Sequence, residues 1–399
     1  MKQSGIDWIG EIPDDWNVNK IDSLYILRNT KVSDKDYPPL SVTMQGIVPQ
    51  LATAAKSDDG DNRKLVKKGD FAINSRSDRR GSSGVSDYDG SVSLINTILT
   101  PRGEMNPIYY NWLFHTIQFE DEFYKWGHGI VDDLWTTRWQ DMKNIFIVVP
   151  PKATQQRIAE YLDKKVSEID SIIEESKKSI EEYKAWKQSV IFEAVTGKNL
   201  NCKKKDSGIE WIGEIPEGWS TIKFKYLHSG SNVGESIDKE LCNDNENDTV
   251  FYTAGLNPIH TIYKQFPVWK YTKQNDLLLA RNGTPYVYNP LTNAVYSDHI
   301  IRVTIKEDYS KKYVQYAIQQ SIFNIVVDTV SITTWSASLW NNQFIPLPPR
   351  NIQEKIVETI ENKLNKINSL ILEKESLIAD LTEYKKSLIF EVVTGKRSV

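Results

Sequence analysis

Residues 154–197 read TQQRIAEYLDKKVSEIDSIIEESKKSIEEYKAWKQSVIFEAVTG, and this stretch decides the fold. Its apolar residues lie alternately four and three positions apart, and the average of 3.5 is the period of a helix that faces another helix in a coiled coil. This apolar seam consists of Leu162, Val166, Ile169, Ile173, Ile180, Tyr183 and Val190, and Ala194 closes it. The pattern predicts a long helix from near Thr154, a suitable N-cap, to near Gly197, which suits a left-handed C-cap.

The same seam recurs 198 residues later in the chain. Its second copy consists of Ile360, Leu364, Ile367, Ile371, Ile378, Leu381 and Leu388, followed by Val392. The polar interruptions coincide as well, because Ser176 matches Lys374 and Lys187 matches Lys385. Two helices with one seam pattern in one chain are expected to pack on each other.

A short sequence box also occurs twice. Ser4–Trp16 reads SGIDWIGEIPDDW, and Ser207–Trp219 reads SGIEWIGEIPEGW, 203 residues later. The chain is therefore a duplication whose unit is box, globular region and long helix. The paired tryptophans and the proline of each box predict a packing element that docks against the helix pair.

The two globular regions have the pattern of mixed α and β structure. In the first region, strands are predicted at Phe71–Ile73, Val92–Leu99 and Ile145–Val149, and a helix is predicted at Pro107–Phe123. In the second region, strands are predicted at Val250–Tyr252, Asp276–Ala280 and His299–Ile305, and a helix at Tyr313–Val327. Beyond this general layout, the two regions resemble each other little in sequence.

These features predict an α+β chain with four segments. Residues 1–152 form the first domain with its box, 153–198 the first long helix, 199–350 the linker, second box and second domain, and 351–399 the second long helix. Antiparallel packing of the helices is expected, because the short linker after Gly197 leads straight into a region that must return to the start of the second helix. Such packing gives the duplicated chain an internal pseudo-two-fold axis.

Charge and composition restrict the classes of function. The chain of 399 residues has a net charge of −4, and each long helix carries −2, so the remainder is neutral on balance. Tyr263–Lys312 is locally basic, which leaves nucleic-acid binding open for the globular regions. With Cys202 and Cys242 alone, no disulfide framework is implied, and a reducing cytoplasm fits. No apolar run is long enough to span a membrane.

No motif in the sequence indicates a catalytic or metal-binding residue. The Thr-Gly-Lys at the end of each helix lacks the preceding glycine and following hydroxyl residue of a P-loop. Asn106–Tyr109 differs from the Asn-Pro-Pro-Tyr motif of amino-methyltransferases at Ile108, and we expect an ordinary loop there. The five histidines and two cysteines have no metal-ligand spacing, and no Gly-x-Ser-x-Gly elbow occurs. The chain is therefore not expected to be an enzyme.

Two polar, basic segments follow predicted strands and are candidates for DNA contact. The first contributes Asn74, Ser75, Arg76, Ser77, Arg79, Arg80, Ser82 and Ser83, and the second contributes Arg281, Asn282 and Thr284, with Lys270, Tyr286 and Tyr288 nearby in sequence. Arginine can read guanine, asparagine can read adenine, and hydroxyl groups can bind phosphates or bases. The alternative is an ordinary solvated turn, because Asp78, Asp87 and Asp89 lie close to the first segment.

The chain resembles the specificity subunits of type I restriction–modification enzymes over its whole length. The resemblance is carried by the duplicated box, by the Pro-Pro-x-x-x-Gln approach to each helix, and by the Phe-Glu-x-Val-Thr-Gly-Lys exits at Phe192–Lys198 and Phe390–Lys396. Lys67–Ser93 also resembles a recurring target recognition domain of that family, and Asp276–Gly283 does so less distinctively.

This resemblance implies a non-catalytic DNA-recognition subunit. Each globular region would be a target recognition domain that reads one half of a bipartite, asymmetric site on double-stranded DNA. The helices, on the order of 60 Å long at about 1.5 Å per residue, would set the spacer and dock two modification subunits. Those methyltransferase subunits would bind S-adenosylmethionine and methylate adenine, while restriction subunits would supply ATP- and Mg-dependent translocation and cleavage. No cofactor is expected on this chain.

Two alternatives remain at the level of sequence. The chain could be a coiled-coil adaptor whose globular ends bind proteins, which the net negative charge of −4 permits. It could also be an enzyme with its own catalytic residues, which would require turnover by the isolated chain. Steep salt dependence of DNA binding separates the first alternative from DNA recognition, because phosphate contacts impose it.

Overall fold

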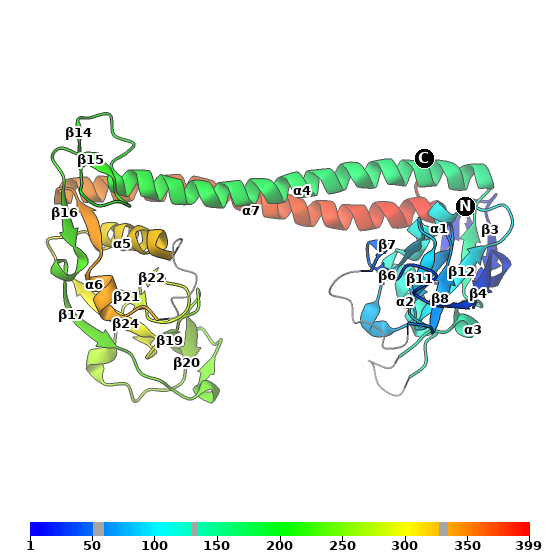
Figure 1. Ribbon diagram of the computed structural model, residues 1–399, viewed down its shortest axis with the longest axis horizontal. Coiled ribbons are helices and arrows are strands. Elements are labelled where there is room, and N and C mark those ends of the chain that lie inside the picture. Colours follow the sequence, from blue (N-terminus) through cyan, green and yellow to red (C-terminus); the bar gives the residue numbers. More distant parts are fainter. Residues whose placement is uncertain (51–59, 130–134, 327–333) are drawn as a thin grey trace. The chain divides into compact units, whose positions relative to one another are not determined.

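The chain folds into two compact units that each contain parts of both long helices. The computed structural model describes residues 1–50, 60–129, 135–326 and 334–399. One unit comprises Met1–Lys177 and Glu375–Val399, and the other comprises Lys178–Lys374. The long helices are α4 (Lys152–Thr196) and α7 (Arg350–Val393), and each runs through both units (Figure 1). These two compact units cut across the four predicted segments, because each unit includes part of both long helices. The predicted segment boundaries therefore remain a prediction.

The two long helices pack antiparallel, as predicted. In the first unit, Lys385 of α7 donates to Asp170 of α4 at 2.5 Å, and in the second unit Lys187 of α4 donates to Asn368 of α7 at 2.8 Å. The early part of each helix therefore meets the late part of the other. Both helices begin directly after a proline pair, so α4 starts at Lys152 and Thr154 lies inside its first turn rather than capping it.

The predicted seam residues lie at this helix–helix contact with two degrees of burial. Leu162, Val166, Ile169, Ile173, Ile180, Val190, Ile360, Ile367 and Leu388 are buried, whereas Tyr183, Leu364, Ile371, Ile378 and Leu381 are half-buried. The polar interruption Ser176 is itself buried, at 2% exposure. The partial exposure follows from the small number of helices, because a two-helix contact covers only one narrow stripe of each.

Domain 1, the globular part of the first unit, is a set of small antiparallel sheets with helices against one of them. Its elements are β1 (Lys2–Gln3), β2 (Glu11–Ile12), β3 (Asn17–Lys20), β4 (Tyr25–Arg28), β5 (Lys31–Val32), β6 (Leu40–Thr43), β7 (Gly46–Pro49), β8 (Arg63–Val66), β9 (Phe71–Asn74), β10 (Ser83–Val85), β11 (Gly90–Val92), β12 (Asn96–Pro101), α1 (Pro107–Phe114), α2 (Ile117–Lys125), α3 (Trp139–Met142) and β13 (Phe146–Val149). The central sheet has the order β10-β9-β12-β4. Its core is continuous with the α4–α7 contact through Tyr109, whose hydroxyl donates to the Val393 carbonyl at 2.7 Å.

Domain 2, the globular part of the second unit, is likewise built from small sheets, but one of its strand pairs is parallel. Its elements are β14 (Lys204–Asp206), β15 (Glu214–Pro216), β16 (Ser220–Lys223), β17 (His228–Val233), β18 (Cys242–Asn243), β19 (Thr249–Tyr252), β20 (Ile259–Thr261), β21 (Asp276–Ala280), β22 (Val287–Tyr288), β23 (Val295–Tyr296), β24 (Ile300–Ile305), α5 (Lys311–Val326), α6 (Ala337–Asn341) and β25 (Phe344–Leu347). The hydroxyl of Tyr313 donates to the Val195 carbonyl of α4 at 3.2 Å, which is the counterpart of the Tyr109 contact.

The central sheets of the two domains have the same strand order. The order β22-β21-β24-β17 in domain 2 matches β10-β9-β12-β4 in domain 1, and all neighbours are antiparallel. The general layout that the two regions share in sequence thus extends to the strand order of their central sheets. Their sequences diverge because a buried strand requires apolar residues at given positions rather than particular ones.

Two predicted elements of domain 1 are interrupted in the structure. The predicted strand Val92–Leu99 is divided between β11 and β12, and Asn96 N–H donates to the Ser93 carbonyl in the turn between them. The predicted helix Pro107–Phe123 is divided between α1 and α2, because the Thr116 side chain accepts from Phe119 N–H and starts a new helix. In domain 2, the helix predicted at Tyr313–Val327 corresponds to α5, and Val327 lies outside the described residues.

Each box packs against the end of the long helix that belongs to the other repeat. Lys396, just after α7, donates to the Ile9 carbonyl of the first box at 2.7 Å. A Cβ on Gly395 would lie 2.5 Å from Pro13 of this box, and a Cβ on Gly197 would lie 2.7 Å from Pro216 of the second box. The first box is thus held by the C-terminal end of the chain.

Candidate nucleic-acid interface

A buried aspartate at the start of the central strand positions the first candidate segment. Asp70 is 2% exposed and accepts hydrogen bonds from Arg28 at 2.6 and 3.1 Å, from Thr100 at 2.9 Å and from Lys67 N–H at 2.9 Å. A carboxylate with this many donors is fully satisfied despite its burial. It fixes the start of β9, and the polar loop at residues 75–82, loop 1, follows at the other end of that strand.

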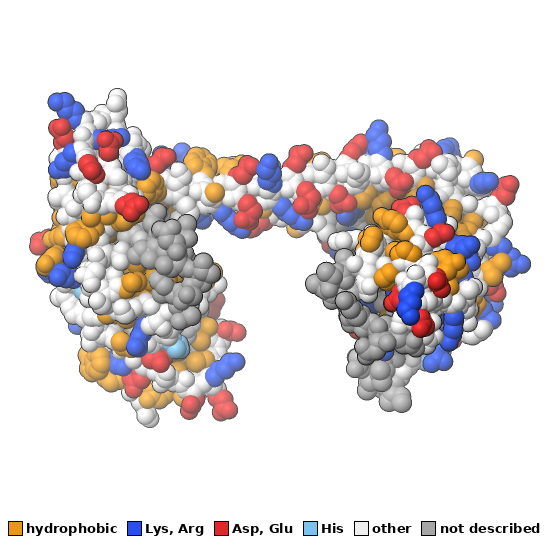
Figure 2. Space-filling model, viewed as in Figure 1, with side chains coloured by type: hydrophobic (Ala, Val, Ile, Leu, Met, Phe, Trp, Pro, Cys, Tyr) orange, Lys and Arg blue, Asp and Glu red, His pale blue; other side chains and the backbone are white. Residues whose placement is uncertain are grey.

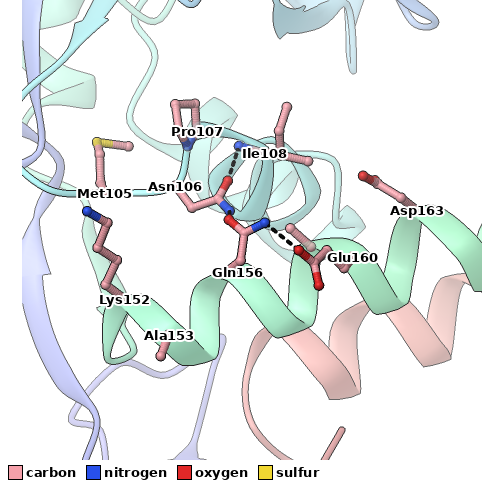
Figure 3. Close-up of a pocket in the computed structure, with 10 residues that line it drawn as sticks. Met105, Asn106, Pro107, Ile108, Lys152, Ala153, Gln156, Glu160 and Asp163 are labelled. Carbon is pink, nitrogen blue, oxygen red and sulfur yellow. Dashed lines mark hydrogen bonds between the residues drawn. The ribbon is translucent and has the colours of Figure 1, made fainter.

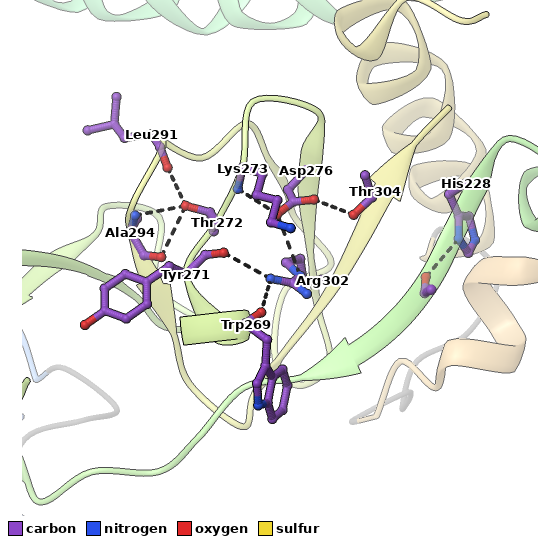
Figure 4. A network of polar contacts seen from close by, with 11 residues as sticks. His228, Trp269, Tyr271, Thr272, Lys273, Asp276, Leu291, Ala294, Arg302 and Thr304 are labelled. Carbon is purple, nitrogen blue, oxygen red and sulfur yellow. Dashed lines mark hydrogen bonds and ion pairs between the residues drawn. The ribbon is translucent and has the colours of Figure 1, made fainter. Parts of the chain in front are cut away.

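Domain 2 builds the same support around Asp276, with one change (Figure 4). Asp276 is fully buried and accepts from Thr304 at 2.5 Å and from Lys273 N–H at 2.8 Å, in the positions of Thr100 and Lys67. Arg302 lies 3.7 Å from this carboxylate, and its guanidinium donates mainly to the carbonyls of Trp269 and Tyr271, at 2.6 and 3.1 Å. Loop 2, residues 281–286, follows β21 as loop 1 follows β9.

Several predicted contact residues of loop 1 and its edges belong to the interior of domain 1. Asn74, Ser75, Ser82 and Ser83 are at most 6% exposed. The Asn74 side chain accepts from Arg76 N–H, and the Ser75 hydroxyl lies 3.0 Å from that of Thr97. Burial and internal bonding argue against direct DNA contact by these four side chains, which instead shape the loop.

The three arginines of loop 1 differ in their neighbours. Arg80 forms ion pairs with Glu120 and Asp121 and lies over the Tyr124 ring. The Arg79 guanidinium lies 3.7 Å from Asp78. Arg76 is exposed, and in the described ranges of the chain no ion pair engages its side chain. Ser77 is half-buried, and its N–H donates to the Trp135 carbonyl.

Loop 2 carries Arg281, Asn282 and Thr284, and hydrogen bonds from Trp335 support its backbone. Trp335 donates its backbone N–H to the Arg281 carbonyl at 2.6 Å and its indole N–H to the Gly283 carbonyl at 2.9 Å. The Asn282 side-chain nitrogen lies 2.6 Å from His299 Nδ1. Arg281 and Thr284 are exposed, and Asn282 is half-buried.

Three other predicted residues of domain 2 are less available. Lys270 is only 12% exposed, and its ammonium donates to the Gly234 carbonyl and pairs with Glu235 at 3.5 Å. Tyr288 is 8% exposed and its hydroxyl donates to the Gly255 carbonyl at 2.9 Å, while Tyr286 is half-buried beside it. Lys270 and Tyr288 therefore support the domain rather than offering free groups, and DNA contact by the remaining predicted residues stays a prediction.

His299 was not among the residues predicted for DNA contact, and the structure brings it to loop 2. His299 lies immediately before β24 and is 52% exposed, and its carbonyl accepts from Arg281 N–H at 2.8 Å. In sequence it is one of several scattered histidines, seventeen residues from Asn282. The pairing of β21 with β24 creates their contact, and no local motif could indicate it.

Two of the open pockets among the described residues are lined by residues outside loops 1 and 2. One, of about 570 Å³, lies between the start of α1 and the first turns of α4 (Figure 3). There the Asn106 side chain caps α1 and donates to Gln156 at 2.6 Å, so Asn106–Tyr109 is a helix start rather than the expected loop. The other, of about 580 Å³, is lined by His299 together with Phe251 and Asn243 of domain 2.

The exposed faces of the long helices carry both signs of charge. Lys and Arg side chains alternate with Asp and Glu along them (Figure 2), and several form pairs one turn apart, such as Lys177 with Glu174 and Lys184 with Glu181. No helix within the described residues is long and apolar enough to cross a membrane.

Known proteins resemble the chain over nearly its whole length. No family model matches it. The putative type I restriction enzyme MjaX specificity subunit of Methanocaldococcus jannaschii is 24% identical, over 97% of this chain and 95% of the relative. The type I restriction enzyme MjaVIII specificity subunit of the same organism is also 24% identical, over 96% of this chain and 93% of the relative.

Solved structures share the fold. The HsdS subunit from Thermoanaerobacter tengcongensis superimposes with a TM-score of 0.57 at 16% identity, and all of both chains is covered. A chain solved in work on complex assembly and conformational transition of the type I R-M system has a TM-score of 0.75 at 14% identity, covering 97% of this chain and 100% of that one. The resemblance carried by the boxes and helix exits is therefore confirmed: the curated relatives of this chain are type I restriction enzyme specificity subunits, and its fold is that of HsdS subunits.

Proposed function

We propose that this chain is the DNA sequence-specificity subunit of a type I restriction–modification complex. Each domain reads one half of a bipartite, asymmetric site on double-stranded DNA. The observation that carries this proposal is that two domains with one strand order each hold a polar loop at the same strand end, joined by one helix pair. A divided DNA site needs two such readers at a fixed separation.

The helix pair has a second role in this proposal. It sets the spacer between the half-sites and docks two modification subunits. The mixed charges on its exposed faces, with −2 on each helix, support contact with protein, because a phosphate-binding surface would carry an excess of positive charge. Restriction subunits complete the complex, which acts in the cytoplasm.

Chemistry resides on the partner subunits in this proposal. The modification subunits bind S-adenosylmethionine and methylate one adenine in each half-site, and the restriction subunits use ATP and Mg. This chain contributes recognition and positioning and has no catalytic residue.

A base-resolution methylation map tests the proposal. Cells that carry this chain with its modification partner should show one bipartite adenine-methylated motif, and cells with the partner alone should not. A map without a new motif would overturn the proposal. DNA binding by the assembled complex should also fall steeply with salt, whereas a protein adaptor would show no such binding.

A further inference from the structure

Arg76 and Asn282 occupy equivalent positions in the two domains. Asn282 lies 206 residues after Arg76, and Asp276 lies 206 residues after Asp70, so each loop residue follows its buried aspartate at the same distance. Arg76 forms an isolated antiparallel bridge with Thr136, and Asn282 forms one with Thr334. Loop 1 and loop 2 thus hold these two residues by the same backbone contacts.

His299, which contacts Asn282, has a counterpart in domain 1 by its place in the fold. Asn96 N–H donates to the Ser93 carbonyl, and Ile300 N–H donates to the Ser297 carbonyl, so the turns before β12 and β24 are equivalent. The residue inside each turn that precedes the strand is Ile95 in domain 1, 39% exposed, and His299 in domain 2, 52% exposed. Among the described residues, the position before the strand therefore holds a polar side chain in domain 2 and an apolar one in domain 1.

His299 leaves Asn282 with the groups that adenine requires. The Asn282 amide nitrogen lies 2.6 Å from His299 Nδ1, and an N–H of the amide donates to this ring nitrogen when the imidazole carries its proton on Nε2. No other hydrogen bond engages this amide within the described residues, so its oxygen remains an acceptor and its second N–H a donor. Adenine offers the N6 amino donor and the N7 acceptor in the major groove, and an asparagine amide pairs with both.

Arg76 offers the groups that guanine requires. Its guanidinium has five N–H donors, and guanine presents the O6 and N7 acceptors in the major groove. Arg80 is held by two carboxylates and Arg79 lies beside Asp78, whereas Arg76 makes no ion pair in the part of the chain that the structure describes. Contacting a base would require Arg79 or Arg80 to give up an ion pair, whereas Arg76 has none to lose among the described residues.

We propose that Arg76 and Asn282 are the equivalent base-reading residues of the two domains. Arg76 reads a guanine in one half-site, and Asn282 reads an adenine in the other, with His299 as its positioning residue. This inference rests on the proposed function. It goes beyond it by assigning one base type to one named residue in each half-site.

Methylation maps of variants test the assignment. Arg76→Ala should relax one guanine position of one half-site, with discrimination reduced about 5- to 150-fold, and should leave the other half-site unchanged. Asn282→Ala should do the same at one adenine position of the other half-site. Lys125→Ala removes the same charge from domain 1 at an exposed residue outside loop 1 and is the control, which should leave the motif unchanged. Equal relaxation by Lys125→Ala, or an unchanged motif with Arg76→Ala or Asn282→Ala, would overturn the assignment.

The positioning role of His299 has its own readout. His299→Gln keeps an acceptor for the Asn282 amide and should retain the adenine preference, whereas His299→Leu imitates Ile95 and should relax the same position as Asn282→Ala. Identical maps for the two His299 variants would contradict the positioning role.

Modified DNA tests the assignment without altering the protein. Replacing each purine of the motif in turn by its 7-deaza analogue removes the N7 acceptor. The wild-type complex should bind less tightly, about 5- to 150-fold, at one guanine of the Arg76 half-site and one adenine of the Asn282 half-site. If no such positions exist, the assignment fails even though a methylated motif is present. If no motif appears for the wild-type chain, the proposed function itself fails.

Discussion

Domain 1 and domain 2 have the same strand order in the central sheet, but the arginine beside the buried aspartate bonds differently in each. Both begin the central strand with a buried aspartate that accepts from a threonine and from a backbone N–H. In domain 1, Arg28 of β4 supplies the cation, with two hydrogen bonds to Asp70. In domain 2, Arg302 of β24 takes that place and bonds chiefly to carbonyls. The comparison teaches that the aspartate belongs to the fold, whereas its charge partner does not.

The largest difference in stability between the domains is expected when these two aspartates, Asp70 and Asp276, are substituted. Asp70→Ala should destabilise domain 1 by about 3–5 kcal/mol, because Arg28 loses its bidentate partner. Asp276→Ala should destabilise domain 2 by about 1–3 kcal/mol, because Arg302 keeps two carbonyls and the remaining loss is that of unpaired donors. Amide hydrogen exchange of β9 and β12, compared with β21 and β24 in the full-length chain, measures both values.

The conservative variants Asp70→Asn and Asp276→Asn serve as controls, because an amide oxygen still accepts from the threonine and the backbone N–H. Equal destabilisation by Asp70→Ala and Asp276→Ala would contradict a stronger ion pair in domain 1.

The helix pair and the duplication could be predicted from the sequence, because each depends on a local or repeated pattern. The seam spacing, the two boxes and the glycines that end both helices are periodic or identical features. Buried strands such as β9 and β21 could be located for the same reason, since continuous apolar runs indicate them.

The equivalence of the two loops could not be predicted, because it depends on contacts between segments distant in sequence. Thr136 and Thr334 reach Arg76 and Asn282 from outside the loops, and His299 arrives from the neighbouring strand. Composition also made Arg76, Arg79 and Arg80 equal candidates, whereas the acidic residues of α2 that engage Arg80 distinguish them only in three dimensions.

A smaller and symmetric effect is expected at the glycines that end the long helices. Gly197 and Gly395 have φ of +72° and +75°, and an added Cβ would contact Pro216 and Pro13. Gly395→Ala should therefore loosen the first box by about 1–3 kcal/mol, through backbone strain and overpacking. Gly197→Ala should loosen the second box to the same extent. Hydrogen exchange of box amides reports both.

This test is specific because each box packs against the end of the long helix that belongs to the other repeat. Gly395 is nearly 400 residues from the first box in sequence, at position 395 against 4–16, yet its variant should affect that box alone. Gly103→Ala, at a glycine of φ +69° with nothing within 4 Å of the added Cβ, is the control for backbone strain without a clash. Loosening of both boxes by either helix-end variant would contradict separate docking.

Lowering the pH should destabilise domain 2 through its buried residue His228. His228 begins β17, where Tyr25 begins β4, and burial chiefly lowers the pKa of His228 below 6.5. The folded chain then binds fewer protons than the unfolded chain, so the stability of domain 2 should fall as the pH drops below about 6.5. Burial raises the pKa of Tyr25 well above 10, so that residue stays neutral throughout. Hydrogen exchange at pH 7.5 and 5.5, corrected for intrinsic rates, should show the loss in domain 2, and His228→Phe should remove it.

The smallest change in stability is expected for the polar contacts between the two long helices. Lys385 and Lys187 occupy matched positions, but the first donates to Asp170 and the second to Asn368. Asp170 is 49% exposed, so Asp170→Asn should cost only a few tenths of a kcal/mol, and this loss should vanish in about 1 M salt. Asn368→Asp should produce a gain of similar size, and denaturant unfolding of the full-length chain at two salt concentrations measures both. A loss above about 1 kcal/mol that persists in salt would mean that polar contacts, rather than the apolar seam, hold the register of the helices.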